Sequence, residues 1–539
     1  MKTEYLFPKR VLLCSDGVEN ADGLLKRKTL QIGLGNEECT VFRGGSFVAL
    51  DFGREVQGGI RILSHIMNDS ARMRLRFGES LAEACSELGE KGACNDHSPR
   101  DFEVCVPQLA DVAFGETGFR FVRVDFIGDG EWRIKNIVAR SQYKDVNFRG
   151  GFECDDSRIN DIYAASRRTL HLCLQNGYVW DGIKRDRLVW IGDLHPESLG
   201  LYCTLGNDDN IKNSLELAVE QSPLPEWMNS IPMYSMWWVV NLHDYYVHTG
   251  DIAFVKRHAE YFSALMRKID GCISCDGKFD FGYDFFDWHT HGTSDEKTGV
   301  AALCLYTAKK AVSLAECLGL PCDGAKSIVS KLRSYRFDVE SAKQVKAMCV
   351  LAGADRRGAA EFFTRGGDAG MSVFMSYYIA RAAAECGKGK QALGMLRSFY
   401  GTMLDKGATT FWEAFDSEWA RNSCNLDELP KPGQTDIHGD NGEFCYKGYR
   451  NSLCHGWSCG PIAFLTFVVL GVRILDVGCK KIAVSPDLCG LKHVKGVYPT
   501  PYGDVFIEHA RRPDGSVESK IKAPPEVEIS DGGGYGLLG

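Results

Sequence analysis

The chain has 539 residues, a formal net charge of −8 and a pI near 6.0. This length is too great for one hydrophobic core and indicates several domains, and the acidic balance gives no reason to expect nucleic acid or an anionic membrane as a partner. No apolar run approaches the roughly 20 residues that a membrane-spanning helix needs, so no membrane partner is expected.

The N-terminal residues and the cysteines indicate the cellular compartment of the protein. Residues 1–10 have no apolar stretch of the secretory type. The 21 cysteines are scattered, without the double pairs of a zinc site. Free thiols in a reducing cytosol explain this usage, and we expect a cytoplasmic protein. The sequence leaves the oligomeric state open, with a homodimer as one alternative.

Residues 1–150 are predicted to form an N-terminal antiparallel β-sandwich. Apolar and polar residues alternate in the segments 46–52, 59–63, 71–77 and 119–126, and turn residues separate them. Alternation of this kind is typical of antiparallel strands with one buried and one solvated face.

Residues 151–478 are predicted to be helical. Helical spacing of apolar residues occurs in the segments 156–174, 198–221, 252–269, 299–318, 341–352, 370–385 and 388–405. About twelve helices fit in this part of the chain, and so many can bury their apolar faces only in a closed or stacked arrangement. A toroid of paired helices is favoured over a solenoid, because no fixed repeat is present.

Residues 479–539 are predicted to form a small C-terminal β domain, also an antiparallel sandwich, packed on the helical one. The short alternating runs 481–484, 503–509 and 516–524 surround turn sequences. The segment 531–539 is rich in glycine, and we expect it to be loose.

The stretch 180–193 carries the strongest functional signal. It reads Trp-Asp-Gly-Ile-Lys-Arg-Asp-Arg-Leu-Val-Trp-Ile-Gly-Asp, with three carboxylates, two arginines and two tryptophans. Its glycines favour a loop. Carboxylate and guanidinium groups bind sugar hydroxyls, and indole faces stack on sugar C–H groups, so a carbohydrate pocket is predicted. The alternative is a surface loop with weak ion pairs.

Further tryptophans, acids and histidines gather in the segments 193–197, 225–251, 279–289, 409–416 and 452–457. Glu413 follows Trp412 in an apolar setting that would raise its pKa and suit proton transfer, although a surface glutamate beside a core tryptophan is an alternative. His455 is either a sugar ligand or, as is more common, a satisfied buried histidine. Trp237 and Trp238 are adjacent, so on a helix at least one belongs to the core.

The sequence offers no convincing metal site. Asp287, His289 and His291 form a trio for which no fourth ligand is suitably spaced. The acidic segment 435–443 is suggestive of a calcium loop but irregular, so the sequence leaves calcium binding open and a solvated loop is favoured. We therefore expect neither a metal nor a cofactor.

These motifs together resemble the α-L-rhamnosidases of glycoside hydrolase family 78. Residues 181–193 resemble the family's signature loop, commonly Asp-Cys-Pro-Gln-Arg-Glu-Arg-x-Gly-Trp-x-Gly-Asp. Thr409-Thr-Phe-Trp-Glu413 and Ser452-Leu-Cys-His455 are similar to its Thr-Thr-x-Trp-Glu and Ser-Leu-Asn-His motifs. Phe286-Asp-Trp288 and Thr249-Gly-Asp251 fall in family order, and residues 50–59 and 119–124 resemble its β-sandwich module. The resemblance covers nearly the whole chain.

The resemblance implies an (α/α)6 barrel flanked by β-sandwiches, and hydrolysis of terminal α-L-rhamnose with inversion. It implies Glu413 as the general base that activates water. The sugar-binding residues that it implies are Asp181, Arg185, Trp190, Asp193, one or both of Trp237 and Trp238, Asp287, Trp288, Trp412 and His455.

One position departs from the family pattern. The family usually has a glutamate as general acid where this chain has Asp186, and the proton donor would retreat by about 1.3–1.5 Å. Glu197 is the alternative acid, with Asp186 favoured. Gly182 and Ile183 replace the usual Cys-Pro, and the chain is short for the family, which leaves the sugar and the leaving group open.

The sequence therefore predicts a cytoplasmic, exo-acting, inverting glycosidase that releases α-L-rhamnose from small glycosides. Two alternatives stand beside it: a glycosidase of the same fold for another terminal sugar, and a catalytically silent carbohydrate-binding protein that has lost its acid. Two carboxyl groups roughly 6.5–9.5 Å apart across a pocket would favour inversion.

Overall fold

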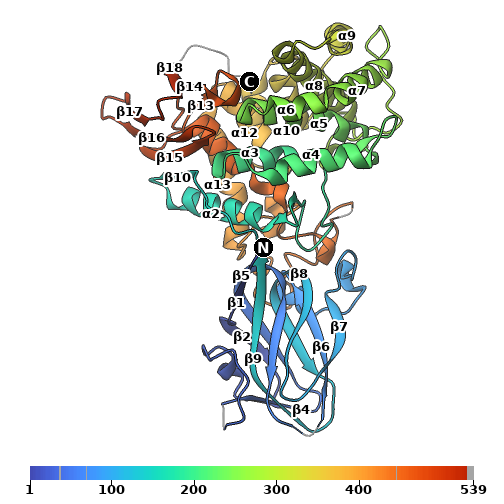
Figure 1. Cartoon of the computed structure of the whole chain (residues 1–539), viewed down its shortest axis with the longest axis vertical. Helices are drawn as coiled ribbons and strands as arrows, with labels where there is room; N and C mark the ends of the chain where they lie inside the picture. The colour runs from blue at the N-terminus through green and yellow to red at the C-terminus, as the bar shows by residue number, and fades with distance from the viewer. Residues whose placement is uncertain (36–37, 68, 445, 531–539) are drawn as a thin grey trace.

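The computed structural model describes residues 1–35, 38–67, 69–444 and 446–530. Figure 1 shows an elongated molecule in which the N-terminal sheet forms one end. The helices form the other end, and the C-terminal strands lie beside them. Part of the predicted C-terminal domain, including its glycine-rich end, falls outside the described residues.

The N-terminal part is a nine-stranded antiparallel sheet built on three long strands, β5 (Phe47–Ser64), β8 (Asp111–Phe126) and β9 (Glu131–Tyr143). The shorter strands are β1 (Lys2–Leu6), β2 (Arg10–Cys14), β3 (Val18–Glu19), β4 (Thr40–Arg43), β6 (Ala71–Gly78) and β7 (Asp101–Val106). The sheet branches, because β9 pairs with β1, β4 and β5, and β5 also pairs with β2 and β8.

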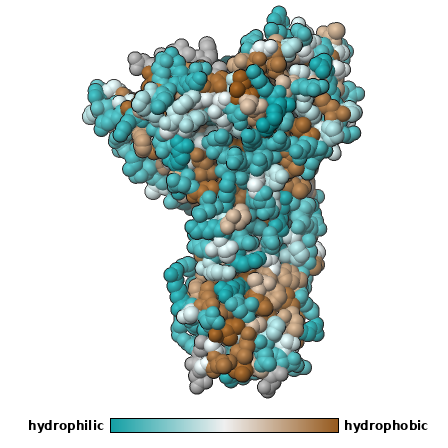
Figure 2. All heavy atoms as spheres, in the orientation of Figure 1, coloured by the Kyte–Doolittle hydropathy of each residue, from teal (hydrophilic) through white to brown (hydrophobic). Residues whose placement is uncertain are grey.

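The long strands depend on a close approach at one glycine. Gly58 on β5 has φ of 145°, and a Cβ there would lie 1.9 Å from the carbonyl oxygen of Arg140 on β9. Only glycine fits where two backbones approach so closely. The sheet encloses a core of its own, in which Phe119 makes edge-to-face contacts with Phe52 and Phe77. In the view of Figure 2, hydrophobic residues also gather on the surface of this lower part.

The helical part follows. Its main helices are α2 (Ser157–Leu172), α3 (Leu194–Thr204), α4 (Asp209–Gln221), α5 (Pro232–Thr249), α6 (Ile252–Arg257), α7 (Ala259–Gly271), α8 (Glu296–Leu318), α9 (Asp323–Lys331), α10 (Lys343–Leu351), α11 (Ala359–Thr364), α12 (Ser376–Glu385), α13 (Gly389–Asp405) and α14 (Gly460–Phe464). The predicted helix 198–221 is two helices. The chain turns at Gly206 (φ of 82°), and the Asp208 carboxylate accepts from the amide of Asn210 to begin α4.

The long helix α5 was not among the segments predicted to be helical. The segment around Trp237 and Trp238 was expected to be loop-like, yet it lies within α5, where Pro232 to His248 are all buried. A helix that is apolar on every side shows no 3.6-residue period, which is why its pattern gave no helical signal. Its ends are typical, with proline in the first turn and Gly250 in the left-handed conformation at the end.

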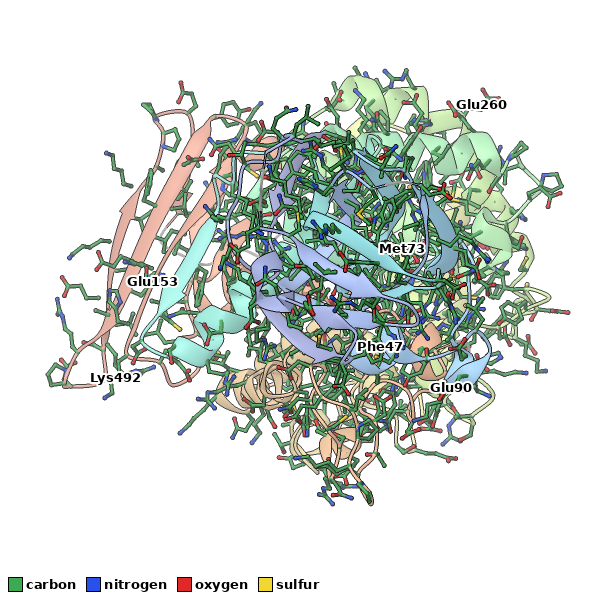
Figure 3. All side chains as sticks on the ribbon, turned by 90° about the horizontal axis from the view of Figure 1, so that it is seen from below. Phe47, Met73, Glu90, Glu153, Glu260 and Lys492 are labelled. Carbon is green, nitrogen blue, oxygen red and sulfur yellow. The ribbon has the colours of Figure 1, made fainter. Side chains whose placement is uncertain are left out.

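The C-terminal strands form two small sheets. The strand β10 (Gly151–Cys154) precedes the helices but pairs with β15 (His493–Thr500), and the sheet continues through β16 (Gly503–Arg511) and β17 (Val517–Lys522). Figure 3 shows Glu153 on β10, beside these C-terminal strands. The other sheet is β13 (Val472–Ile474), β14 (Lys481–Val484) and β18 (Glu528–Ser530).

The C-terminal strands were expected to be antiparallel throughout, but one pair is parallel. The strands β14 and β18 pair in parallel, with Ile482 opposite Ile529. Parallel pairing is possible here because the intervening strands β15, β16 and β17 form a long crossover between them. None of the cysteines among the described residues forms a disulfide, and no helix in the described ranges is both long and apolar enough to cross a membrane.

Candidate active site

A cavity opens where the helical part meets the N-terminal sheet. The side chains that line it are those of Asp181, Arg185, Asp186, Trp190, Asp193, Ile231, Tyr234, Phe285, Trp288, Glu413, Tyr446, His455 and Trp457. One lysine and one arginine of the 180–193 loop bind this loop to the N-terminal part of the chain. The Lys184 ammonium lies 2.8 Å from the Glu79 carboxylate, and the Arg187 guanidinium lies 3.2 Å from that of Glu116.

Asp181 folds the loop back on itself. Its carboxylate accepts from the backbone amides of Asp186 at 2.8 Å and Leu188 at 2.9 Å. Its own carbonyl oxygen accepts from the amide of Gly456 at 2.6 Å, which joins the loop to the segment that carries His455. Burial, together with the nearby Asp186 charge, raises the pKa of the Asp181 carboxyl to about 7.

Arg185 connects the two carboxyl groups named as base and acid. Its Nη2 donates to both Glu413 oxygens at 2.7 Å, and its Nη1 donates to Asp186 Oδ1 at 2.9 Å. Its Nε donates to the carbonyl oxygen of Arg450 at 2.5 Å, which fixes the plane of the guanidinium. Two carboxyl groups held by one guanidinium lie within the range of separations, up to about 9.5 Å, that retaining and inverting glycosidases use.

Glu413 lies deep in the cavity, with only 4% of its side chain exposed. Its Oε2 accepts from the amide of Ser452 at 3.0 Å, and the Trp457 indole donates to its carbonyl oxygen at 2.9 Å. Burial raises the pKa of Glu413, while the charge of Arg185 opposes the shift. A buried carboxylate held by an arginine and an amide can accept a proton from a water molecule.

His455 lies among three carboxylates at the base of the cavity. Its Nε2 is 3.6 Å from Asp181, 3.8 Å from Glu413 and 3.9 Å from Asp193. Burial, and then the charge of Arg185, lower the pKa of His455 well below its usual range, so this imidazole is neutral at neutral pH. Burial and the charge of Asp181 raise the pKa of Asp193, which accepts from the Tyr234 hydroxyl at 3.2 Å.

Asp186 lies at the mouth, with 18% of its side chain exposed. The Trp190 indole donates to its Oδ2 at 3.2 Å. The Nε2 atom of His97, which belongs to the N-terminal part, lies 3.2 Å from its Oδ1. His97 was not expected at the site, and nothing in the local sequence of an N-terminal sheet loop would have indicated it.

The aromatic residues that line the cavity were predicted only in part. Trp190 and Trp288 line the cavity, as the sequence indicated. Ile231, Tyr234, Phe285, Tyr446 and Trp457 also line it and were not named as site residues. Their proximity in sequence to expected residues was the available signal.

Glu197, the alternative acid, is not in the cavity lining. It lies on α3, fully buried behind the loop, where a Cβ on Gly456 would be 1.8 Å from its Oε1. Burial, followed by the charges of Asp193 and Asp181, raises its pKa well above the usual range. A neutral carboxyl enclosed by backbone cannot reach a leaving group in this arrangement, so the structure does not favour Glu197 as the proton donor.

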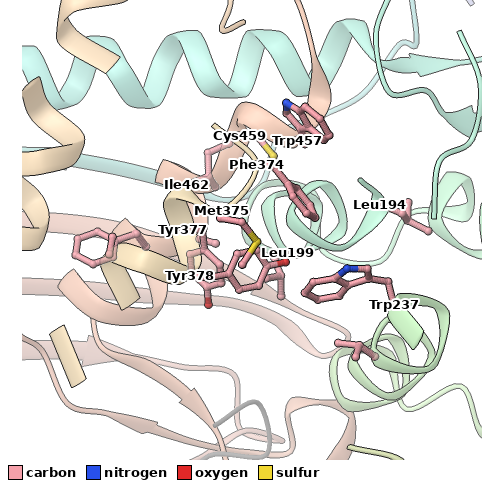
Figure 4. Packing of buried hydrophobic residues seen from close by; sticks show 14 of the residues in the cluster. Leu194, Leu199, Trp237, Phe374, Met375, Tyr377, Tyr378, Trp457, Cys459 and Ile462 are labelled. Carbon is pink, nitrogen blue, oxygen red and sulfur yellow. The ribbon is translucent and has the colours of Figure 1, made fainter. Parts of the chain in front are cut away.

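Four other expected sugar contacts lie outside the lining. Trp237 stacks on His195 at 5.1 Å and packs against Phe374 and Tyr378 in the interior drawn in Figure 4. The other three are likewise buried beside the cavity or in the core: Trp238, Trp412 and Asp287. Each lies next to a helix or to a lining residue, which explains why sequence position alone placed it in the pocket.

Two of the residues considered as metal ligands in the sequence are paired with charged protein groups. His291 lies 2.8 Å from Glu296, and Asp440 of the acidic segment lies 2.6 Å from Lys91. Among the described residues, Glu79, Glu83 and His438 do lie close enough to share an ion. The Lys184 ammonium already lies 2.8 Å from Glu79 and 3.3 Å from Glu83, so the positive charge there is supplied by the protein.

The first half of the helical part, which contributes several residues to the cavity, matches a six-hairpin glycosidase domain. Residues 147–329 match the bacterial alpha-L-rhamnosidase 6 hairpin glycosidase domain, and residues 471–530 match the bacterial alpha-L-rhamnosidase C-terminal domain. Two parts of the chain thus match bacterial α-L-rhamnosidase domains, and for these parts the resemblance seen in the sequence is confirmed.

Solved structures agree on the fold. A family 78 rhamnosidase of Bacillus sp. GL1 superposes with a TM-score of 0.72 at 20% identity, over 94% of this chain and 55% of that one. A rhamnosidase from Klebsiella oxytoca with rhamnose bound gives 0.64 at 21%, over 79% and 88%. A Streptomyces avermitilis α-L-rhamnosidase complexed with L-rhamnose gives 0.68 at 14%, over 90% and 48%.

The chain therefore spans little more than half the length of the Bacillus protein. At these identities the likeness establishes a shared fold. No protein with a curated description matches the sequence.

Proposed function

We propose that this protein hydrolyses terminal α-L-rhamnosides by an inverting, single-displacement mechanism. The observation that carries the proposal is the position of Arg185, which binds Glu413 at 2.7 Å and Asp186 at 2.9 Å on the wall of one cavity. The family relationship, and the rhamnose bound by two structural neighbours, support rhamnose as the sugar.

In the proposed reaction, Glu413 takes a proton from a water molecule, and the resulting hydroxide attacks the anomeric carbon. Asp186 in its acid form gives its proton to the glycosidic oxygen as the bond from the anomeric carbon breaks. The sugar leaves with inverted configuration and the former aglycone leaves as an alcohol. Each turnover transfers one proton at each carboxyl group, and exchange with solvent restores both.

The burial of three polar lining residues supports exo action. Asp181, Asp193 and His455 line the cavity and are all buried, so we propose that they enclose the terminal sugar. Their oxygens and the neutral imidazole can bind the hydroxyls of one terminal sugar, while Trp190 and Trp288 offer indole faces to its C–H groups. A cavity of this shape accepts the end of a glycoside.

The proposal extends to the architecture. The six-hairpin domain is taken to close as an (α/α)6 barrel, over residues 151–478, flanked by β-sandwich domains at 1–150 and 479–539. Packing of α5 on α8, of α8 on α10 and of α10 on α12 supports such closure. We also propose a cytoplasmic location, for which the free cysteines of the described ranges are the support.

The test is hydrolysis of 4-nitrophenyl α-L-rhamnopyranoside, with the anomer formed first identified by NMR. We expect turnover by the wild type with inversion, and a loss of about 10²- to 10⁴-fold in kcat for Glu413→Gln. Glu418→Gln, at an exposed glutamate five residues away, is the matched control and is expected to retain activity.

Asp186 motivates the alternative of a silent carbohydrate-binding protein, because its side chain is shorter than the usual glutamate. That alternative requires L-rhamnose binding, measured by calorimetry, without turnover of any rhamnoside. Turnover of a different glycoside and none of rhamnosides would instead identify the same fold acting on another sugar.

A further inference from the structure

A second hollow opens on the outer side of Asp186. It is lined by His97, Ser98, Pro99, Phe102, Gly115, Glu116 and Arg187. All but Arg187 belong to the N-terminal part of the chain. Two features join the hollow to the sugar cavity: His97, whose Nε2 is 3.2 Å from Asp186 Oδ1, and Arg187, the residue that follows Asp186.

Asp186 therefore lies on the border between two hollows. A general acid acts on the oxygen that joins the terminal sugar to its leaving group. If the sugar occupies the inner cavity, the leaving group has to extend past Asp186 on the other side. The hollow at His97 and Arg187 adjoins Asp186 through the contact with His97.

We propose that this hollow is the leaving-group subsite and that it selects a hydroxylated ring, such as a second sugar unit. The inference rests on the proposed function and assigns the N-terminal sheet a part in choosing the substrate. Apart from Arg187, the residues that it adds to the candidate active site lie outside the 180–193 loop.

The chemistry of the lining supports a polar ring as the ligand. Glu116 has 56% of its side chain exposed, so its carboxylate remains available to a hydroxyl. Phe102 is half-buried and stacks on Phe77 at 6.0 Å, which holds its ring in place beside Pro99. A carboxylate beside a fixed aromatic ring suits the hydroxyls and C–H face of a sugar.

The polar side of the hollow is organised before any ligand binds. The Arg187 guanidinium donates to the Glu116 carbonyl oxygen at 3.0 Å and to its carboxylate at 3.2 Å. Its Cζ lies 4.8 Å from the ring centre of Trp180, so the guanidinium is held from a second side. Groups fixed in this way lose little freedom when they bind a substrate.

The test compares two substrates and one product. The substrates are an α-L-rhamnosyl-glucose disaccharide and 4-nitrophenyl α-L-rhamnopyranoside, and the product is free L-rhamnose as a competitive inhibitor. For Glu116→Ala we expect kcat/KM for the disaccharide to fall about tenfold, the size of one hydrogen bond to a charged group. The L-rhamnose inhibition constant, which depends on the inner cavity alone, should change by less than about twofold.

A second variant guards against a folding defect. Phe102→Leu keeps an apolar side chain on β7 but removes the ring face, and we expect the same selective loss for the disaccharide. Glu103→Ala is the matched control, because Glu103 is exposed and paired with Arg72, and its side chain points to the opposite face of β7 from Phe102. Glu103→Ala should leave kcat/KM unchanged for both substrates.

The outcomes separate the two proposals. A wild type that hydrolyses the rhamnosides, with variants that affect both substrates and L-rhamnose equally or not at all, overturns the subsite and leaves the proposed function standing. A wild type that hydrolyses neither rhamnoside overturns both. A loss confined to the disaccharide supports the subsite.

Discussion

One nitrogen of Arg185 binds both carboxylate oxygens of Glu413 at 2.7 Å. The same guanidinium reaches Asp186, so a single side chain positions the groups assigned to both proton transfers. The charge of Arg185 favours the ionised form of Glu413, which a general base requires, and opposes the burial that raises the pKa of Glu413. The arrangement also makes the distance between base and acid depend on one planar group.

Arg185→Lys should reveal this dependence. A lysine keeps the positive charge but has no planar fork, so it cannot hold Glu413 and Asp186 in fixed positions together. We expect kcat on the nitrophenyl substrate to fall by about 10²-fold or more. Arg72→Lys is the control, because Arg72 forms an exposed pair with Glu103, and it should leave kcat unchanged. Unchanged kcat in Arg185→Lys would contradict the positioning role.

The acid can be distinguished by the leaving group. Asp186→Asn should reduce kcat/KM for a rhamnosyl disaccharide by about 10²- to 10⁴-fold, and that for the nitrophenyl substrate much less, because nitrophenolate leaves without a proton. Glu197→Gln should show no such difference between substrates. A leaving-group-dependent loss in Glu197→Gln alone would transfer the acid role to that residue.

Stability should depend on pH through Asp181. Its pKa is raised from an ordinary value of 3.8 to about 7 in the folded protein. Between these values the folded state holds a proton that the unfolded chain has lost, so the free energy of unfolding falls as pH rises from about 4 to about 7. Denaturant unfolding across this range should show a shallower fall for Asp181→Asn than for the wild type. Equal slopes would contradict the assignment.

The pair formed by Lys184 and Glu79 links the active-site loop to the N-terminal sheet. The carboxylate of Glu79 also accepts from the amide of Leu453 at 2.6 Å, close to the backbone that holds Glu413. Lys184→Met leaves buried carboxylates without their cation, and we expect it to lower the free energy of unfolding by about 3–5 kcal/mol.

Two further variants interpret that result. Lys495→Met breaks the exposed pair with Glu153 and should lower the free energy of unfolding by less than about 1 kcal/mol. Lys184→Met combined with Glu79→Gln should recover part of the loss, because the second change removes a buried charge. A double variant no more stable than Lys184→Met would argue against an uncompensated carboxylate.

Much of this site was predictable because its residues come from short, contiguous motifs. Asp181, Arg185, Asp186, Trp190 and Asp193 all lie on one loop, and the structure places all five in the lining of the same cavity. Chemistry that is local in sequence needs only local geometry to assemble.

The remaining parts of the site depend on the tertiary fold. Trp238 donates its indole N–H to the carbonyl oxygen of Leu215 inside the helical core, and no local pattern separates such a tryptophan from one in a pocket. His97 reaches Asp186 from a segment nearly ninety positions earlier, so its role exists only after two parts of the chain have packed. Burial on every side also concealed α5.

The pairing of β10 with β15 has a consequence for biosynthesis. Gly151 lies opposite Val497, so the strand that opens the helical region acquires its neighbour only after more than three hundred further residues have been made. A ribosome-bound chain has to carry β10 with an unpaired edge throughout that interval. Closing so long a loop is entropically unfavourable and slow, which places completion of this sheet late in folding.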